Sequence, residues 1–233
     1  MLHKEIICII PARKGSKGIK NKNIKKINGK ELIQYSIDTA KKLNKLVDIC
    51  VSTNSIRVKG IVKKNKIDFF GLRPEKLSTD YIETYDVIKY ELKKYEHILK
   101  RNYKYILLLQ PTSPVRDTKK ILKAINFLKK NNNIDSIVSV KDVGANHPLR
   151  MKIFKKSFLV NYSGKKKENM LPRQKLPKVY IRSGSIYLTT RKSFFKYKSL
   201  VGKKCKGIIL KNLETTNIDN IDDLNSFKKS LKK

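Results

Sequence analysis

Cysteine is scarce in this sequence. Cys8, Cys50 and Cys205 are its three cysteines in 233 residues, they lie far apart, and no CxxC pair occurs. The scarcity excludes a disulfide framework, and no spacing of the kind that binds zinc is present. Cys8 and Cys50 fall in apolar, strand-like runs. We therefore expect these thiols to be small buried side chains in a protein of the reducing cytosol.

Long apolar segments are also absent. No run approaches the roughly 20 apolar residues that span a bilayer. The chain passes almost directly into its first predicted strand, so we expect neither a signal peptide nor a transit peptide. No internal repeat and no Ser/His/Asp arrangement is visible. The length of 233 residues favours one cytoplasmic α/β domain, with room for a small extension and no membrane partner.

Acidic residues are few. The chain has 19 Asp and Glu against 55 Lys and Arg, which gives a formal net charge of +36. The excess is mostly lysine and is spread over the whole length, and together with abundant Asn and Ile it is typical of a genome rich in A and T. A dedicated nucleic-acid binder concentrates arginine on one face and adds aromatic stacking or a recognisable module. We therefore expect no nucleic-acid partner, although the charge favours anionic small substrates.

The apolar patterns of strands and helices alternate along the chain. Strands are expected at about 6–10, 47–52, 68–70, 104–110, 135–140, 185–188 and 207–210, and helices at about 32–46, 58–62, 84–99, 118–128 and 224–231. This order predicts a Rossmann-like, doubly wound and mostly parallel sheet. Between about 141 and 182 the pattern loosens, and we interpret this stretch as an extension of a single domain.

The loop after the first predicted strand favours phosphate binding. The buried run Ile6–Ile10 stops at Pro11 and gives way to a basic loop that contains Gly15 and Gly18. Such a loop presents backbone N–H groups and cations to a phosphate chain at the edge of a parallel sheet. It lacks the G-x-G-x-x-G spacing of dinucleotide binders and the Lys-Ser/Thr of a Walker loop. On spacing alone, a solvated turn remains the alternative.

Further motifs follow in a recognisable order. They are the stretch from Ile9 through Pro11-Ala12-Arg13 to Lys22-Asn23, then Val51-Ser52-Thr53-Asn54, Leu72-Arg73-Pro74 with Thr79-Asp80, Leu109-Gln110-Pro111-Thr112-Ser113-Pro114 with Arg116, Pro172-Arg173-Gln174, Gly184-Ser185-Ile186-Tyr187, and Asn217-Ile218-Asp219. Together they resemble the acylneuraminate cytidylyltransferases, also called CMP-sialic acid synthetases. The resemblance covers nearly the whole chain, and its opening loop and LLQPTSP segment are its most specific parts.

The resemblance implies an activity and a set of partners. Members of that family transfer CMP from CTP to the anomeric hydroxyl of a nine-carbon α-keto (nonulosonic) acid and release pyrophosphate, with Mg²⁺. Their extension forms a homodimer and helps to bind the sugar of the partner subunit. We therefore expect CTP and a nonulosonic acid as substrates, Mg²⁺ as cofactor and a homodimer as the assembly.

The resemblance also assigns site residues. The nucleotide-binding set is Ala12, Arg13, Gly15, Ser16, Lys17, Lys22, Asn23, Arg73, Thr79 and Asp80. The sugar-binding set is Gln110, Thr112, Ser113, His147, Arg173 and Gln174. Arg173 is the candidate clamp for the sugar carboxylate, because its planar fork pairs well with a carboxylate. The catalytic set is Arg13, Lys22 and Asp219, since transfer at a phosphate depends on neutralising the charge of the leaving group.

Three departures from the family pattern concern charge and sugar recognition. The usual Asp-Ile-Asp metal motif is Asn217-Ile218-Asp219 here, and alternation on a strand predicts both side chains on one face, as a shared Mg²⁺ needs. Asn54 follows Ser-Thr where the family has Asp. The usual Arg and Asn are displaced or replaced around Ile181–Gly184. The alternative for the stretch from Asn217 is a plain helix cap.

These departures leave other functions open. One is a cytidylyltransferase for an eight-carbon keto acid, and another is a relative that uses a different nucleotide or an amino sugar. A third is a non-catalytic protein of the same fold that binds a nucleotide or nucleic acid and has lost its metal site. Asn54 and Asn217 are the residues that favour this third alternative.

Overall fold

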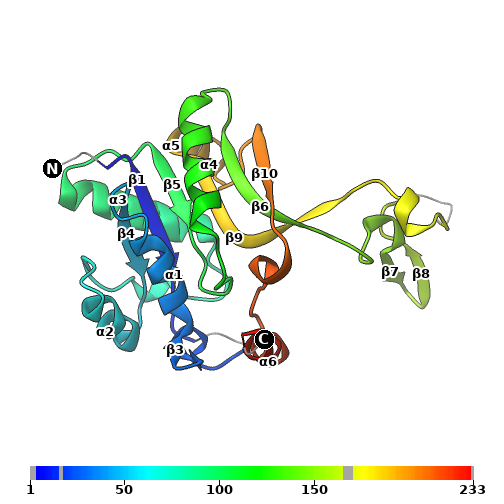
Figure 1. The fold of residues 1–233 in the computed structure, drawn as a ribbon, viewed down its shortest axis with the longest axis horizontal. Helices are drawn as coiled ribbons and strands as arrows, with labels where there is room; N and C mark the ends of the chain where they lie inside the picture. Colours follow the sequence, from blue (N-terminus) through cyan, green and yellow to red (C-terminus); the bar gives the residue numbers. More distant parts are fainter. Residues whose placement is uncertain (1–3, 16–17, 165–169, 232–233) are drawn as a thin grey trace.

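A six-stranded sheet forms the centre of the computed structural model, which describes residues 4–15, 18–164 and 170–231 (Figure 1). Its strand order is β10-β6-β9-β5-β1-β4. The strands are β1 (Ile6–Pro11), β4 (Val47–Ser52), β5 (Tyr105–Leu108), β6 (Ser136–Asp142), β9 (Tyr180–Thr190) and β10 (Cys205–Ile209). β9 runs antiparallel to both of its neighbours, and the other pairs are parallel. The expected mostly parallel α/β fold is confirmed.

Helices cover both faces of this sheet. They are α1 (Leu32–Lys41), α2 (Ile56–Lys64), α3 (Thr84–Leu99), α4 (Thr118–Lys130) and α5 (Arg191–Tyr197), and α6 (Ile221–Ser230) lies below the sheet edge. Side chains of β1 alternate between the two layers: Ile6, Cys8 and Ile10 pack with α1, α2 and α4. Ile7 and Ile9 pack with α3 and α5. A strand buried on both faces reads as a continuous apolar run, which explains the start of the sequence.

Two expected strands do not form. Asp68–Phe70 has no ladder partner among the described residues, although Phe69 and Phe70 pack into opposite layers of the core as they would in a strand. The carbonyl of Asp68 instead accepts a hydrogen bond from the Tyr95 hydroxyl at 3.1 Å. Asn217–Asp219 also lies in a loop, so the expected alternation on a strand is wrong.

Helices α2, α4 and α6 each begin after a polar residue whose side chain caps the helix. Ser55 caps α2 and Asp117 caps α4, each by accepting a backbone N–H with its side chain. Asn220 and Asp223 form a reciprocal capping box at the start of α6. The helix cap considered as the alternative for this stretch therefore exists, and it begins one residue after Asp219.

A third apolar cluster fixes α6 beneath the first loop. Leu224 and Phe227 of α6 pack with Ile19 of that loop and with Leu32 at the start of α1. Short strands β2 (Lys26–Ile27) and β3 (Lys30–Glu31) form a hairpin between that loop and α1. The last helix is thus part of the support of the predicted phosphate loop.

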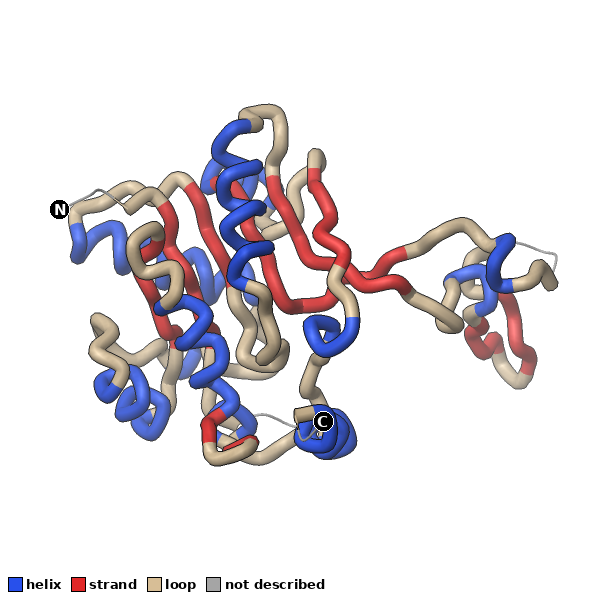
Figure 2. Tube along the Cα trace, in the orientation of Figure 1, coloured by secondary structure: helices blue, strands red, loops and turns tan. Residues whose placement is uncertain are grey.

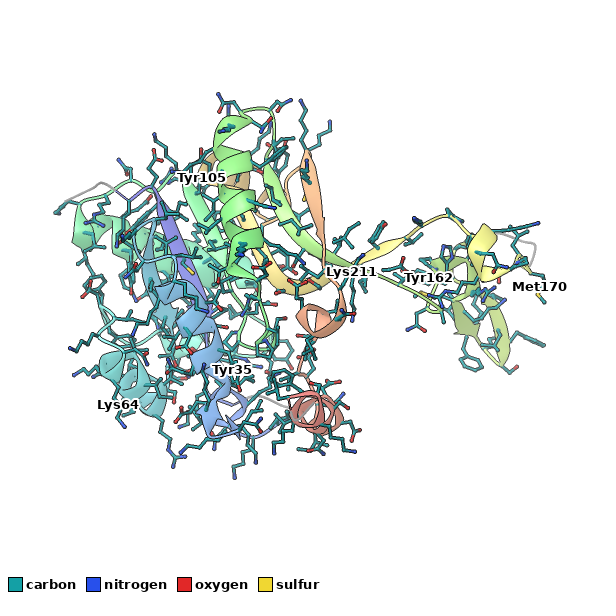
Figure 3. All side chains as sticks on the ribbon, viewed as in Figure 1. Tyr35, Lys64, Tyr105, Tyr162, Met170 and Lys211 are labelled. Carbon is teal, nitrogen blue, oxygen red and sulfur yellow. The ribbon has the colours of Figure 1, made fainter. Side chains whose placement is uncertain are left out.

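The chain leaves the sheet after Asp142, the end of β6, and returns at Tyr180, the start of β9. The two strands continue past the other strands toward a small subdomain that lies away from the body (Figure 2). It contains the antiparallel hairpin of β7 (Lys152–Lys155) and β8 (Phe158–Asn161). Tyr162 and Met170 lie there, away from the sheet (Figure 3), with 62% and 83% of their surface exposed.

Two of the cysteines are buried, as expected. Cys8 and Cys50 lie in the sheet without any exposed surface. Burial raises the pKa of the Cys8 thiol to about 12, and burial beside Glu91 raises the pKa of Cys50 as well. Cys205 is partly exposed. Within the described ranges, no helix combines the length and the apolar character that crossing a bilayer requires.

Candidate active site

A pocket of about 210 Å³ opens where β1 ends, at the carboxyl edge of the sheet. Ligands of open α/β sheets bind at this edge. The pocket is lined by Pro11, Arg13, Gly18, Lys22, Asn23, Gln110, Pro111 and Thr112. The structure thus brings together predicted nucleotide residues from the first loop and predicted sugar residues from the turn after β5.

The first loop is held by the last residue of β4, by Thr53 after it, and by Asn23. The Ala12 N–H donates to the Ser52 carbonyl at 2.8 Å, and the Thr53 hydroxyl donates to the Ala12 carbonyl at 2.6 Å. Asn23 Nδ2 donates to the Arg13 carbonyl at 3.0 Å. Because both backbone groups of Ala12 are used and its side chain is buried, Ala12 serves this site as an anchor of the loop.

Lys22 lies between the loop and the stretch before α6. Its Nζ donates to the Ile218 carbonyl at 3.0 Å and contacts the Asp219 carboxylate at 3.1 Å. The Lys22 side chain is 12% exposed and that of Asp219 is 61% exposed. The loop also approaches closely at Gly18, where an added Cβ would lie 2.2 Å from the Asp219 carbonyl oxygen. Two of the three predicted catalytic residues are therefore direct neighbours.

Arg13 is shared with a second cavity of about 190 Å³. The other residues along it include Arg73, Thr79 and Asp80. The Arg13 guanidinium forms an ion pair with Asp80 and donates to the Ser78 carbonyl at 3.5 Å. The predicted triphosphate and base segments therefore adjoin each other through Arg13.

Arg73 is 4% exposed, although it carries a charge. Its Nε donates to the Ser78 hydroxyl at 3.1 Å, and one of its terminal nitrogens has no hydrogen-bond partner among the described residues. Burial lowers the pKa of its guanidinium, and the nearby Glu91 carboxylate opposes that shift. A buried unpaired donor at a cavity wall is suited to a ligand acceptor.

Hydrogen bonds from Arg116 and Ile218 hold the turn after β5 in place. Arg116 donates to the Gln110 carbonyl at 2.5 Å and to the Ser185 carbonyl at 2.8 Å. The Ile218 N–H donates to the Thr112 carbonyl at 2.8 Å, which connects the turn to the stretch before α6. The Ser113 hydroxyl is buried, with no hydrogen-bond partner in the part of the chain that the structure describes. Of the predicted sugar residues here, Gln110 and Thr112 thus line the pocket and Ser113 lies behind it.

A larger cavity of about 500 Å³ begins at Gln110, which it shares with the first pocket. Its walls include Glu83, Arg182, Tyr187 and Lys198. None of these four was assigned to the predicted site. Tyr187 ends the motif that begins at Gly184, and Arg182 lies in the stretch Ile181–Gly184 that departs from the family pattern. Gly184 of β9 gives the Gln110 side chain its room: it has φ +79°, and an added Cβ would lie 3.1 Å from Gln110 Oε1.

The remaining predicted sugar residues lie in the extension. His147, Arg173 and Gln174 line a cavity of about 330 Å³ there, away from the pocket at β1. His147 is 4% exposed; its Nδ1 accepts the Leu149 N–H at 3.2 Å, and its Nε2 lies 3.0 Å from the Pro177 carbonyl oxygen. Both ring nitrogens thus hold the extension together, so the structure gives His147 a supporting place.

Three further predicted nucleotide residues belong to the first loop. Ser16 and Lys17 are outside the described residues. Gly15 is described, has φ +80°, and has no atom within 4 Å of a Cβ added there. Its left-handed backbone conformation, rather than a close neighbour, is what favours glycine at this position.

Comparison with known proteins decides the family. The sequence profile of the cytidylyltransferase family matches residues 7–227. The chain belongs to the cytidylyltransferase family. It is therefore a nucleotidyltransferase, and the expected resemblance to the N-acylneuraminate cytidylyltransferases is confirmed.

Individual cytidylyltransferase relatives differ in length. The chain is 31% identical over 215 residues to post-translational flagellin modification protein B of Campylobacter coli, covering 92% of this chain and 90% of that protein. It is 32% identical over 200 residues to an N-acylneuraminate cytidylyltransferase of Escherichia coli, covering 84% of this chain and 46% of that enzyme. The chain thus spans about half the length of the second relative.

Solved cytidylyltransferase structures share the fold. CMP:2-keto-3-deoxy-manno-octonic acid synthetase in complex with CTP has a TM-score of 0.68 at 15% identity, with 98% of this chain and 99% of that chain covered. The 4-diphosphocytidyl-2C-methyl-D-erythritol synthase of Anaerococcus prevotii has a TM-score of 0.61, also at 15% identity, with 99% of both chains covered.

The oxygen ligands near the pocket suit a Mg²⁺ ion that is also bound by substrate phosphates. Among the described residues, no group of three or more His, Cys, Asp or Glu side chains gathers to hold a metal. Asn217 Nδ2 donates to the Asp219 carboxylate, so these two side chains meet although they are not on a strand. Mg²⁺ is commonly held by one or two carboxylates together with substrate phosphates. The donor set therefore suits an ion that arrives with a nucleotide, held by Asp219 with Asn217 beside it.

Proposed function

We propose that this enzyme transfers CMP from CTP to the anomeric hydroxyl of a nonulosonic acid and releases pyrophosphate. The hydroxyl oxygen forms a bond to the α-phosphorus as the bond from that phosphorus to the bridging oxygen breaks. The hydroxyl proton is lost to solvent or to a base, and pyrophosphate leaves with the electron pair. Arg13 and Lys22 would stabilise the charge on the leaving pyrophosphate.

One observation carries the proposal: the pocket with Arg13 and Lys22 and the larger cavity adjoin each other at Gln110, which lines both. A triphosphate in the first pocket would have its α-phosphate near Gln110, facing a second substrate in the cavity beyond. That cavity has cationic side chains from Arg182 and Lys198, which suit an acceptor that carries a carboxylate. The volume of about 500 Å³ is large enough for a nine-carbon sugar acid.

The choice of acceptor class also draws on the relatives. At 29–31% identity over about nine tenths of the chain, they include N-acylneuraminate cytidylyltransferases of Streptococcus agalactiae and CMP-N,N'-diacetyllegionaminic acid synthases of Legionella pneumophila and Campylobacter jejuni. The sugars in these names share a nine-carbon acid skeleton. We propose that the acceptor of this enzyme has the same skeleton, and that the residues lining the Gln110 cavity contact its substituents.

Mg²⁺, a homodimer and a cytoplasmic location complete the proposal. Mg²⁺ would supply additional positive charge to the triphosphate beside Asp219. The extension would place Arg173 and Gln174 of one subunit at the acceptor cavity of the other, because within one chain the two regions lie apart.

The test is pyrophosphate release from purified protein with CTP, Mg²⁺ and a panel of nonulosonic and eight-carbon keto acids. We expect release with a nonulosonic acid. Release with the eight-carbon acid alone would overturn the acceptor class, and no release with any acid, despite CTP binding, would favour a non-catalytic relative.

Arg13→Ala tests the assigned charge stabilisation. Removing one such donor costs about 100- to 1,000-fold in turnover, and we expect a loss in this range with acceptor affinity nearly unchanged. Arg57→Ala is the control, because Arg57 is exposed on α2, outside the cavities described above. Equal losses of turnover and acceptor affinity in a folded Arg13→Ala protein would contradict the role.

A further inference from the structure

We propose that Asn54 and Glu75 form a coupled pair that positions the phosphate loop. Asn54 follows β4, and its Oδ1 accepts the backbone N–H of Lys14 at 2.8 Å. Its Nδ2 donates to both carboxylate oxygens of Glu75, at 3.0 and 3.2 Å. One side chain therefore connects the first loop to the 3-10 helix that begins at Glu75.

The pair requires an amide at position 54. A side-chain amide accepts with its oxygen and donates with its nitrogen, whereas an ionised carboxylate only accepts. An aspartate here would still accept the Lys14 N–H. It would also place a second negative charge within about 3 Å of the Glu75 carboxylate, and like charges this close repel. Glu75 thus explains the neutral residue at position 54, without any reference to a metal.

The two segments that the pair joins are the ones that hold Arg13. Lys14 directly follows Arg13 in the loop. The helix that Glu75 begins, Glu75–Leu77, leads into Ser78 and Asp80, which contact the Arg13 guanidinium. Asn54 and Glu75 therefore fix the distance between the Arg13 backbone and the partners of its side chain. They are positioning residues, and neither lines the pockets that contain Arg13.

A double-mutant cycle tests the coupling. Asn54→Asp, Glu75→Gln and the double variant are compared with the wild type by calorimetric CTP binding and by kcat at saturating CTP. We expect Asn54→Asp to weaken CTP binding about tenfold, with kcat within about threefold, because the loop is displaced but its cations remain. The double variant should recover to within about threefold of the wild type, because the amide introduced by Glu75→Gln can donate to the new carboxylate.

Two further measurements separate positioning from simple charge. Asn44→Asp adds the same charge at an exposed position after α1, and CTP affinity should stay within about twofold of wild type. Amide hydrogen exchange at Lys14 should accelerate in Asn54→Asp and return toward wild type in the double variant. This readout needs no nucleotide, and the inference rests on the proposed function only in the choice of CTP as a probe.

The outcomes are distinct. If the effects of Asn54→Asp and Glu75→Gln simply multiply, or if the Lys14 amide exchanges at the same rate in all four proteins, the pair is not coupled. A wild type that binds no CTP would instead overturn the proposed function, and the exchange data would still decide the coupling.

Discussion

At Gly18 the first loop packs directly against the stretch before α6. Its Cα faces the carbonyl of Asp219, and no side chain fits between them. The same loop contributes Ile19 to the apolar cluster beneath α6, so the contact is packed on both sides. The first loop can lie this close to Asp219 because Gly18 has no side chain.

Gly18→Ala should weaken CTP binding about tenfold, since overpacking costs about 1–3 kcal/mol and a factor of ten corresponds to about 1.4 kcal/mol. Calorimetry with CTP and Mg²⁺ measures the effect. Gly60→Ala is the matched control, because Gly60 lies inside α2 with open space around it. This control should bind CTP normally and gain about 0.5–1 kcal/mol in stability. Unchanged CTP affinity in Gly18→Ala would show that the loop adjusts without cost.

The sequence predicted residues that line the pocket, but it did not predict the contacts that these residues make. Arg13 and Lys22 were expected near phosphate, and both line the first pocket. Their ion pairs with Asp80 and Asp219 were not foreseen, because partners 67 and 197 positions away leave no local pattern. Arg182 was noted only as part of the stretch Ile181–Gly184 that departs from the family pattern, and it was not assigned to the site. Whether these residues act on a nucleotide stays a prediction.

At the scale of elements, Glu5 connects three of them before β1 begins. Its carboxylate pairs with Lys104, which precedes β5, and with Lys129 near the end of α4. Hydrogen bonds from Lys104 and Lys129 lower the pKa of Glu5 to about 2, from an ordinary value of 4.5. The carboxylate is thus favoured in the folded protein relative to the unfolded chain.

A lowered carboxyl pKa stabilises the fold at a pH above the unfolded value and loses that effect as the pH falls. The contribution of Glu5 should therefore be complete above about pH 4.5 and disappear toward pH 2. Glu5→Gln should lower the thermal midpoint at pH 7 and reduce the fall in midpoint over this acid range. Glu31→Gln, with a carboxylate removed elsewhere, is the control. Identical acid profiles for Glu5→Gln and the wild type would contradict the assignment.

Helices and strands were predicted correctly where a segment with apolar periodicity also has partners for its backbone hydrogen bonds. The helices and the strands of the central sheet satisfied both conditions. The stretch Asp68–Phe70 had the alternation of a strand, but Phe70 packs against the Tyr95 ring at 4.7 Å and no strand of the described chain lies alongside it. Alternation reports which faces are buried, whereas a strand also needs a neighbour for its backbone groups.

At the scale of the whole molecule, the extension presents an apolar surface. Phe154 and Leu159 are cross-strand partners in the β7–β8 hairpin, share one face, and are 73% and 60% exposed. Phe158 lies on the other face and is 74% exposed. Exposed apolar clusters of this kind mark interaction sites. The proposed homodimer would cover them with a second copy of the chain.

Replacing both Phe154 and Phe158 by Lys should convert a wild-type dimer into a monomer in sedimentation velocity. CTP affinity should remain within about threefold, and CMP transfer should fall at least tenfold or so, because the acceptor cavity would lose the partner's extension. Ile56→Lys is the control, since Ile56 is 65% exposed on α2 in the body of the molecule. A wild type that sediments as a monomer, or a double variant that stays dimeric, would refute this assembly.

The overall architecture followed from the order of elements, but the direction of β9 did not. A chain that returns through a long extension can enter the sheet in either direction, and the sequence of the extension has no periodicity that selects one. The loosened pattern between about 141 and 182 predicted the extension, and the family resemblance supplied its role. The structure adds that β6 and β9 carry it as a continuous antiparallel pair out to Asp142 and Tyr180.

The contact between Lys22 and Asp219 has a consequence for biosynthesis. The two residues are 197 positions apart, so the ribosome makes one side of the pocket long before the other. The sheet strands β1, β4 and β5 can pair while the later part of the chain is still being translated. The pocket at the end of β1 cannot be complete until residues 218 and 219 have emerged and α6 has packed on Ile19. A nascent chain of this protein can therefore pair β1, β4 and β5 before the pocket at the end of β1 is complete.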